Sequence, residues 1–352
     1  MTQSRLVLIA PILLAAVGAA SPAAAQNRTL AELFRAVDPA VVEIAAVRNA
    51  APQAGIVSKT PAGNLGSGFL ISGDGRIMTA AHVVQVADEV TVRFVTGEVV
   101  AARVLASDPG ADVALIQAES VPAGIEPARL GNSNGAAVGD QVFVIGAPFG
   151  VAHSLTVGHI SARRVSNRLF GGFEPVEILQ TDAAINQGNS GGPMFSMNGE
   201  VIGIVSHILS SSGGFEGLGF VITSNLAMQV LLDEPNPWTG LDGVLVDGSL
   251  ARALNIPQAA GIVVQSVAAG SPASALGLRP GSLPASIGDR TLILGGDVIL
   301  AVQGIRIGEP DFDRRIRDRK RSLTGDDRLE IQVLRGGQVI RLEATVGLLT
   351  SD

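Results

Sequence analysis

The chain has 352 residues, of which 47% are hydrophobic and 16% charged, and this balance excludes a disordered polypeptide. Its length allows about two or three domains, and a net charge of −7 without a long basic run argues against nucleic acid as a main partner. It contains no cysteine, which excludes disulfide scaffolds, thiol nucleophiles and cysteine-ligated metal sites.

The first 25 residues have the pattern of a secretory signal peptide. Arg5 lies in a short polar lead, residues 6–17 are apolar, and three alanines end at Ala25. The apolar run is shorter than the roughly 20 residues of a membrane-spanning helix, and Pro11 interrupts it. We therefore expect cleavage after Ala25 and export to the periplasm or beyond, with an uncleaved membrane anchor as the alternative.

The next segment predicts one short helix and then a long β-rich block. Residues 30–37 carry apolar side chains at helical spacing, and Pro39 ends the helix. From residue 41 to about 223, short β-rich runs alternate with Gly, Asp and Asn turns, without a long amphipathic helix between them. This pattern is typical of antiparallel strands in a barrel or sandwich. A helical piece at 224–234 closes the block.

Residues 235–240 (PNPWTG) are typical of a linker, because they hold two prolines and a glycine. Residues 241–348 beyond it form a unit of different pattern, with both strands and helices. We expect its strands at 243–246, 261–267, 297–304, 328–335 and 338–346, and its helices at 271–278 and 309–322.

The segment QTDAAINQGNSGGPMF, residues 180–195, surrounds Ser190 with three glycines and a proline. A plain surface turn uses the same residue types. They also suit a serine whose neighbouring N–H groups must converge on one small space, because glycine adopts turns that other residues resist. The polar residues elsewhere in the β-rich block favour this second interpretation.

His82 is expected at the end of a strand in MTAAHVV, and Asp112 stands directly before the apolar strand VALIQ. A carboxylate at the mouth of such a strand is costly to bury without a partner. A serine hydroxyl becomes a nucleophile when an imidazole takes its proton, and the imidazole needs a carboxylate on its other nitrogen. We therefore predict a triad of His82, Asp112 and Ser190. Asp108 is the competing acid, but it precedes a proline and is typical of a turn.

The same chemistry requires convergent N–H donors for the oxyanion of the tetrahedral intermediate. In GNSGGP these donors would come from Gly188 and Ser190, with Asn189 carrying the turn between them. This reaction needs no cofactor and no metal, and we predict neither.

Together, TAAHVV, DVALIQ and QTDAAINQGNSGGP resemble the HtrA/Deg family of trypsin-like serine proteases, and the last hundred residues resemble its PDZ domain. The resemblance covers nearly all of the chain after the signal peptide. It implies a mostly β fold, with a chymotrypsin-like double β-barrel over residues 26–234 and an α+β PDZ domain over 241–348. The triad would lie in the cleft between two six-stranded barrels.

The resemblance also assigns the substrate-binding residues. The family's S1 pocket matches Ile185 and Ile208, and Ser206 and His207 lie on the same edge strand as Ile208. Two isoleucines would leave a small apolar pocket suited to Val or Ala at the P1 position. The alternative is that both isoleucines fill a barrel core.

The family's loop that binds a peptide's C-terminal carboxylate matches Gly240, Leu241, Asp242, Gly243 and Val244. Asp242 is the one residue of these that departs from the family's pattern. Asp242 stands where an apolar residue is usual, and it would repel a peptide's C-terminal carboxylate if it faced the groove. About fourteen extra residues, 282–295, also interrupt the PDZ sequence. Some family members carry a similar elongation, so we expect the domain to tolerate it.

Two loops complete the resemblance. The family's regulatory loop falls at residues 162–175, where Arg164 or Arg168 is the candidate sensor. A short segment at 48–64 replaces the long inhibitory loop of some members, so we do not expect that loop to inhibit a resting hexamer.

The first functional hypothesis is an exported, ATP-independent serine endopeptidase that cleaves unfolded or damaged envelope proteins. As the family implies, it would work as a homotrimer or larger homo-oligomer and bind peptide ligands through its PDZ domain. The second is a PDZ-bearing chaperone or scaffold that binds unfolded chains with little turnover, against which the complete triad argues. The third is a regulatory protease with one signalling substrate.

Overall fold

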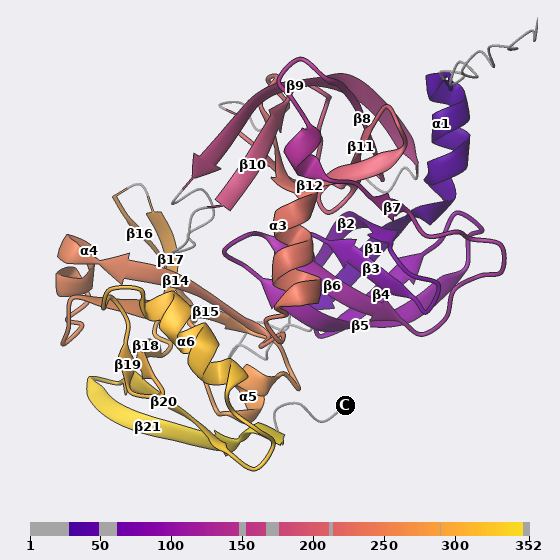
Figure 1. Cartoon of the computed structure of the whole chain (residues 1–352). Helices are drawn as coiled ribbons and strands as arrows, with labels where there is room; N and C mark the ends of the chain where they lie inside the picture. The colour runs from indigo at the N-terminus through magenta and orange to yellow at the C-terminus, as the bar shows by residue number, and fades with distance from the viewer. Residues whose placement is uncertain are drawn as a thin grey trace, which may run out of the picture.

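The computed structural model describes residues 28–48, 62–147, 153–166, 176–210, 214–288 and 290–347. The predicted signal peptide, most of the segment at 48–64 and the end of the predicted regulatory loop, with Arg168, lie outside them. The described residues form two β-barrels and a smaller C-terminal unit beside them (Figure 1). Within these ranges, no helix has the length and apolar character needed to cross a membrane.

Helix α1 (Leu30–Val37) begins where the sequence predicts it. The Thr29 side chain accepts a hydrogen bond from the Glu32 N–H, and the Glu32 carboxylate accepts one from the Thr29 N–H. This reciprocal pair satisfies two donors at the start of the helix. A 3-10 turn, η1 (Asp38–Ala40), contains Pro39 and leads into the first barrel.

The first barrel has six antiparallel strands and is closed by the pairing of β1 with β4. They are β1 (Val41–Arg48), β2 (Ala62–Leu70), β3 (Arg76–Thr79), β4 (Glu89–Arg93), β5 (Val99–Asp108) and β6 (Val113–Ala118), in the order β1-β2-β3-β6-β5-β4. The sequence predicted a strand with His82 at its end in MTAAHVV, residues 78–84. The strand instead ends at Thr79, and residues Ala81–Val84 form the one-turn helix α2, which is too short to leave a periodic pattern.

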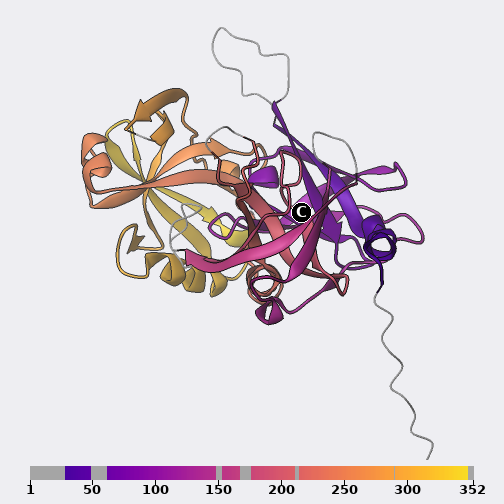
Figure 2. The ribbon, with the colours of Figure 1, turned by 90° about the horizontal axis from the view of Figure 1, so that it is seen from above.

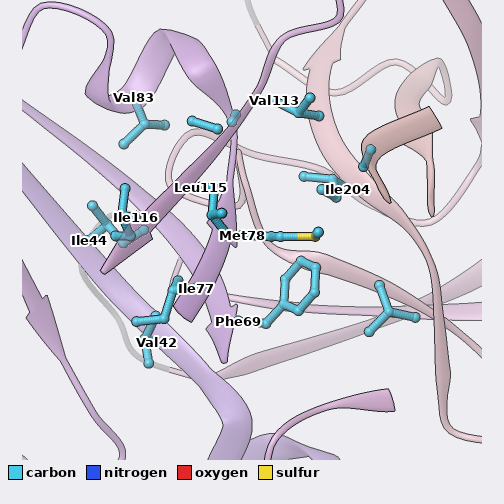
Figure 3. Close-up of a cluster of buried hydrophobic side chains, with 14 of the residues drawn as sticks. Val42, Ile44, Phe69, Ile77, Met78, Val83, Val113, Leu115, Ile116 and Ile204 are labelled. Atoms are coloured by element: carbon cyan, nitrogen blue, oxygen red, sulfur yellow. The ribbon is translucent and has the colours of Figure 1, made fainter. Parts of the chain in front are cut away.

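The core of the first barrel is made by inward-facing residues that alternate along its strands. Figure 3 shows part of this cluster, in which the labelled side chains are Val42, Ile44, Phe69, Ile77, Met78, Val83, Val113, Leu115, Ile116 and Ile204. Ile204 belongs to a strand of the second barrel, so one continuous cluster spans both barrels. The shared core fixes the position of one barrel against the other, which is where the candidate site lies.

The second barrel is also a ring of six strands, because β11 pairs with both β8 and β12. Its strands are β8 (Gln141–Gly146), β9 (Ser154–Ser166), β10 (Val176–Thr181), β13 (Gly219–Thr223), β12 (Glu200–Ile208) and β11 (Pro193–Ser196) in ring order, with β7 (Arg129–Leu130) added parallel to β12. A 3-10 turn, η2 (Ser133–Gly135), follows β7. The fold is therefore mostly β with two six-stranded barrels, as predicted.

Helix α3 (Ser224–Met228) and the π-helical turn η4 (Gln229–Asp233) lead from the second barrel back to β5 and β6 of the first (Figure 1). The predicted linker then runs along β5. The Ser107 N–H donates to the Asn236 carbonyl over 3.0 Å, and Pro237 forms a bridge with Ala106. These residues are thus attached to the first barrel.

The C-terminal unit contains one antiparallel sheet of six strands. Five of them have the order β14-β15-β18-β20-β21, and the short β19 pairs with β18. Its elements are β14 (Leu241–Asp247), α4 (Gly248–Ala253), β15 (Ala260–Val267), α5 (Pro272–Ala275), β16 (Leu283–Ile287), β17 (Arg290–Leu294), β18 (Val298–Val302), β19 (Ile305–Arg306), α6 (Phe312–Arg321), β20 (Arg328–Arg335) and β21 (Gln338–Thr345). Figure 2 shows this unit to one side of the barrels. The inserted residues 282–295 form the hairpin β16–β17, which leaves the five-strand order intact.

Candidate active site

His82 and Asp112 meet at one end of the first barrel. His82 lies on α2, and its Nδ1 is 2.9 Å from each carboxylate oxygen of Asp112. The backbone N–H of His82 also donates to Asp112 Oδ1 over 3.0 Å. Asp112 has a φ of +54°, a left-handed conformation that aspartate tolerates better than most residues. The turn between β5 and β6 therefore directs this carboxylate at the imidazole.

The environment of the pair favours a basic imidazole. The Asp112 side chain is only 8% exposed, whereas 49% of the His82 side chain is accessible. Partial burial lowers the pKa of His82, but the hydrogen bond and the negative charge of Asp112 outweigh it, so the pKa is raised above 6.5. A raised pKa suits a group that must take a proton from a serine hydroxyl.

Ser206 supports Asp112 from the second barrel. Its hydroxyl donates to Asp112 Oδ2. The register of β12 against β13 shifts between Val205 and His207, so Ser206 occupies an irregular position in the strand. Such a bulge re-aims a side chain, and here the re-aimed hydroxyl reaches the carboxylate. The sequence placed Ser206 in the substrate-binding strand and did not predict this contact.

Ser190 lies on the loop before β11 of the second barrel. Its hydroxyl donates to the Ser206 carbonyl oxygen over 3.2 Å. Among the described residues, no hydrogen bond joins this hydroxyl to His82. The hydroxyl must therefore turn from Ser206 toward His82 before the imidazole can take its proton, a tightening that unliganded sites commonly need.

The loop around Ser190 depends on glycine. Gly188 has a φ of +101° and Gly191 a φ of +84°. A Cβ at Gly191 would stand 2.2 Å from the Ser67 carbonyl oxygen, so a side chain cannot fit there. The Asn189 N–H donates to the Asn186 carbonyl over 3.0 Å, whereas the N–H groups of Gly188 and Ser190 have no acceptor within the described part of the chain. Two donors thus stay free beside the serine.

Ser67 on β2 holds this loop against the first barrel, and sequence reasoning missed it. Its N–H donates to the Ser190 carbonyl over 2.8 Å, and its hydroxyl donates to the Gly188 carbonyl over 2.7 Å. The same hydroxyl accepts from the Ala147 N–H over 2.9 Å. The sequence shows only a small residue between two glycines, Gly66 and Gly68, which signals tight packing and no partner.

The two S1 candidates differ in burial. Ile185 is 2% exposed and belongs to the core cluster of the second barrel, and the half-buried Ile208 packs against that cluster. Ile208 pairs with Gly219 across β12 and β13, and a Cβ at Gly219 would lie 2.5 Å from Ile185 Cδ1. The glycine leaves Ile185 uncovered by a side chain at this point. Ile185 thus lies in the core cluster and also borders Gly219.

His207 lies next to Ser206 and is half-buried. Its Nδ1 is 3.2 Å from Ser206 Oγ, and its ring centroid is 5.1 Å from that of Phe220. Burial lowers the pKa of His207, the negative charge of Asp112 raises it, and the charge of His82 lowers it further, with a net lowering. A second imidazole therefore shares the environment of Asp112.

The predicted peptide loop lies against the first barrel. The Gln85 side-chain amide donates to the Leu241 carbonyl over 2.7 Å, and the Trp238 indole N–H donates to the Gln85 carbonyl over 2.9 Å. Gln85 directly follows α2, so the C-terminal unit contacts the helix that carries His82. No local sequence feature singles out Gln85.

The other residues predicted in that loop flank this contact. Gly240 is buried with a φ of +67°, and Gly243 and Val244 continue β14. Asp242 is exposed at its surface, and the packing around its carboxyl group removes enough water to raise its pKa, which the charge of Arg48 partly offsets. In the predicted regulatory loop, Arg164 Nε donates to Gln180 Oε1 over 3.2 Å on the neighbouring strand.

Two six-stranded barrels, with an imidazole–carboxylate pair on one and a serine on the other, define a chymotrypsin-like serine peptidase fold. Residues 66–204 match the family model for the trypsin-like peptidase domain. The curated relatives include a "Probable periplasmic serine endoprotease DegP-like" from Ectopseudomonas mendocina, which is 37% identical over 295 residues. These cover 82% of this chain and 57% of the relative, so the chain spans little more than half of its length. A protein of the same name from Halomonas elongata is 37% identical over 292 residues, which are 81% of this chain and 56% of that protein.

Solved structures give the same answer. "HtrA-type protease AlgW with decapeptide" is 30% identical with a TM-score of 0.51, and the match covers 90% of this chain and 98% of that one. "HtrA-type protease AlgW with tripeptide" is 31% identical with a TM-score of 0.51, and the match covers 90% and 96%. The chain belongs to the HtrA family of trypsin-like serine proteases.

Proposed function

We propose that the chain is an ATP-independent serine endopeptidase that cleaves unfolded or damaged polypeptides in the periplasm. The observation that carries this proposal is the buried Asp112 carboxylate held between His82 and Ser206, with Ser190 on the facing loop. Its relatives are named periplasmic endoproteases, and the N-terminal pattern predicts export. The family resemblance adds a homotrimer or larger homo-oligomer to the proposal.

In this mechanism, His82 Nε2 takes the Ser190 proton as the serine oxygen bonds to the substrate carbonyl carbon. Asp112 holds the Nδ1 proton of His82 and stabilises the imidazolium. The oxyanion accepts hydrogen bonds from the free N–H groups of Gly188 and Ser190. His82 then gives the proton to the leaving amine, and water hydrolyses the acyl-enzyme through the same residues.

Purified protein is expected to cleave unfolded casein without ATP, and most cuts should follow small aliphatic P1 residues such as Val and Ala. A pocket bordered by Ile185 and Ile208 offers no counter-charge for a basic side chain, and burying an unpaired charge costs several kcal/mol. The measurement is mass spectrometry of the fragments. Ile208→Ala should enlarge the pocket, so that the enzyme also cleaves after Leu and Phe at the P1 position.

A majority of cuts after Arg or Lys would contradict the pocket assignment while leaving the protease intact. Binding of casein without cleavage under any condition would instead favour the scaffold hypothesis. The Ser190 hydroxyl would then stay hydrogen-bonded to the Ser206 carbonyl oxygen. Cleavage confined to one folded substrate would favour the regulatory protease.

We further propose that the C-terminal unit is a PDZ domain that regulates the peptidase. β14 is an end strand of its sheet and α6 is its longest described helix, an arrangement suited to binding a peptide by strand addition. The contact of Gln85 with Leu241 and Trp238 offers a route from this strand to α2. Gly240 to Val244 remain the proposed peptide-binding residues.

Apolar peptides that stimulate cleavage are expected to shift the emission of Trp238, the only tryptophan. Trp238 borders a cavity of about 440 Å3 between the linker and the C-terminal unit, so its surroundings change if the unit moves. Fluorescence and peptidase rate should be titrated together on the full chain, with an amidated peptide alongside because of Asp242.

The test variant is Gln85→Leu, which removes the side-chain links of this buried residue to Leu241 and Ser107, and the control is Gln141→Leu at an exposed position on the second barrel. Stimulation should be lost in the first and kept in the second. Peptide binding that changes neither emission nor rate would make the unit a tether and not a regulator.

A further inference from the structure

Asp112 is linked to two imidazoles, of which the catalytic mechanism uses one. His82 contacts the carboxylate directly, with Nδ1 2.9 Å from both oxygens. His207 reaches it through the hydroxyl of Ser206, which lies 3.2 Å from His207 Nδ1 and donates to Asp112 Oδ2. The three groups come from α2, the turn before β6, and β12, so both barrels contribute.

Proton counting assigns the direction of each bond. A serine hydroxyl has one proton, and a carboxylate can only accept. The Ser206 proton is therefore committed to Asp112, and the bond between Ser206 and His207 requires the proton on His207 Nδ1. The chain of donors runs from His207 Nδ1–H to the Ser206 hydroxyl and from there to Asp112. Such chains polarise one another and strengthen each bond.

Among the described residues, two charged groups act on His207. Asp112 faces it from the turn before β6 and His82 from α2, while β13 contributes the uncharged Phe220 against its ring. Each hydrogen bond that Asp112 accepts stabilises its negative charge. A carboxylate stabilised in this way gains less from a positive charge on His82, so the pKa of His82 is lowered. A proton on His207 acts in the same direction, because two cations beside one carboxylate repel each other.

We propose that His207 is a positioning residue of the peptidase: through Ser206 it shares the negative charge of Asp112 with His82 and extends the working range of the enzyme toward acidic pH. The inference rests on the proposed triad. It gives His207 a role on the carboxylate, in addition to its place in the substrate-binding strand.

The test compares the pH profile of kcat/KM in three full-length variants. His207→Phe keeps a ring against Phe220 and loses the Nδ1 donor. His207→Asn keeps a donor at that position and loses the ring. His159→Phe, at an exposed histidine on β9, is the control.

In His207→Phe the acidic limb should move to higher pH, so kcat/KM near pH 5.5 should fall about threefold or more against wild type. The comparison is made relative to each variant's own plateau at pH 9, where His82 is neutral in both, because His207 also lies in the substrate-binding strand. His207→Asn should restore part of the acidic activity, and His159→Phe should follow wild type. A His207→Phe profile lowered equally at all pH values, or an unmoved acidic limb, would overturn the inference.

A second readout does not need activity. NMR titration of the histidine ring protons in a Ser190→Ala background should show His82 titrating at higher pH when His207 is phenylalanine. An unchanged His82 titration overturns the inference even if the protease is active. A protein that cleaves nothing but shows the shifted titration would instead contradict the proposed function and leave the coupling of the two histidines standing.

Discussion

Ser190→Ala is expected to abolish cleavage of casein and of short peptides while the protein stays folded. In the proposed mechanism the serine oxygen forms the covalent bond to the substrate. Within the described residues its hydroxyl makes one hydrogen bond, to the Ser206 carbonyl, which supports no other element. Acceleration that depends only on binding and the oxyanion hole remains, about 10³–10⁴ over water in the best-studied triads. The measurement is the initial rate on both substrates, with the thermal unfolding midpoint as the check on folding.

Casein degradation by Ser190→Ala at the wild-type rate would show that another residue is the nucleophile. If Ser190→Ala unfolds, its loss of activity does not test the role of the hydroxyl. Ser190→Thr, which keeps the hydroxyl in a more crowded position, would then be measured in its place. Its rate should lie well below wild type, because the added methyl restricts rotation toward His82.

Asp112→Asn is expected to lower kcat by about 10⁴, the loss known for the equivalent change in a trypsin-like triad. Asparagine keeps the size of the side chain, but its amide can present an N–H to His82 Nδ1, which stabilises the wrong tautomer. The Ser206 hydroxyl also loses a charged acceptor. Single-turnover kinetics with a chromogenic peptide would separate this loss in chemistry from any change in substrate binding.

Asp108→Asn is the matched control. Its Oδ1 accepts from the Ala111 N–H over 2.9 Å, and an asparagine oxygen can accept the same bond. This variant should keep kcat within a few-fold of wild type. Equal losses at both positions would mean that the turn between β5 and β6 matters more than the charge of Asp112.

Local sequence features predicted the strands, the helix at 30–37 and the β-rich C-terminal unit, because alternation and turn residues record which faces are buried. They also singled out Ser190, because its neighbouring glycines suit a closely packed loop as well as a plain surface turn. The Cβ contact at Gly191 gives the physical reason, because that glycine packs directly on the Ser67 carbonyl. The roles assigned to His82, Asp112 and Ser190 remain predictions until the variants are measured.

What sequence could not supply are the contacts made between distant segments. Ser67 and Gly188 are 121 residues apart, and Gln85 and Leu241 are 156 apart, so no local pattern links them. The bulge at Ser206 also escaped prediction, because a one-residue register shift leaves alternation nearly unchanged. The hairpin β16–β17 was expected only as an insertion.

The attachment of residues 236–238 to β5 limits how far the C-terminal unit can travel. If the contacts of the C-terminal unit break, among them Leu241 with Gln85, Ala269 with Asp88 and Arg321 with Glu234, the chain stays anchored where Asn236 and Trp238 are bonded to β5. Only Thr239 and Gly240 then separate the anchored chain from β14. Two extended residues span about 7 Å. The unit could then swing about a pivot and could not drift away, so a polypeptide held on β14 would always be presented to the barrels from nearly the same point.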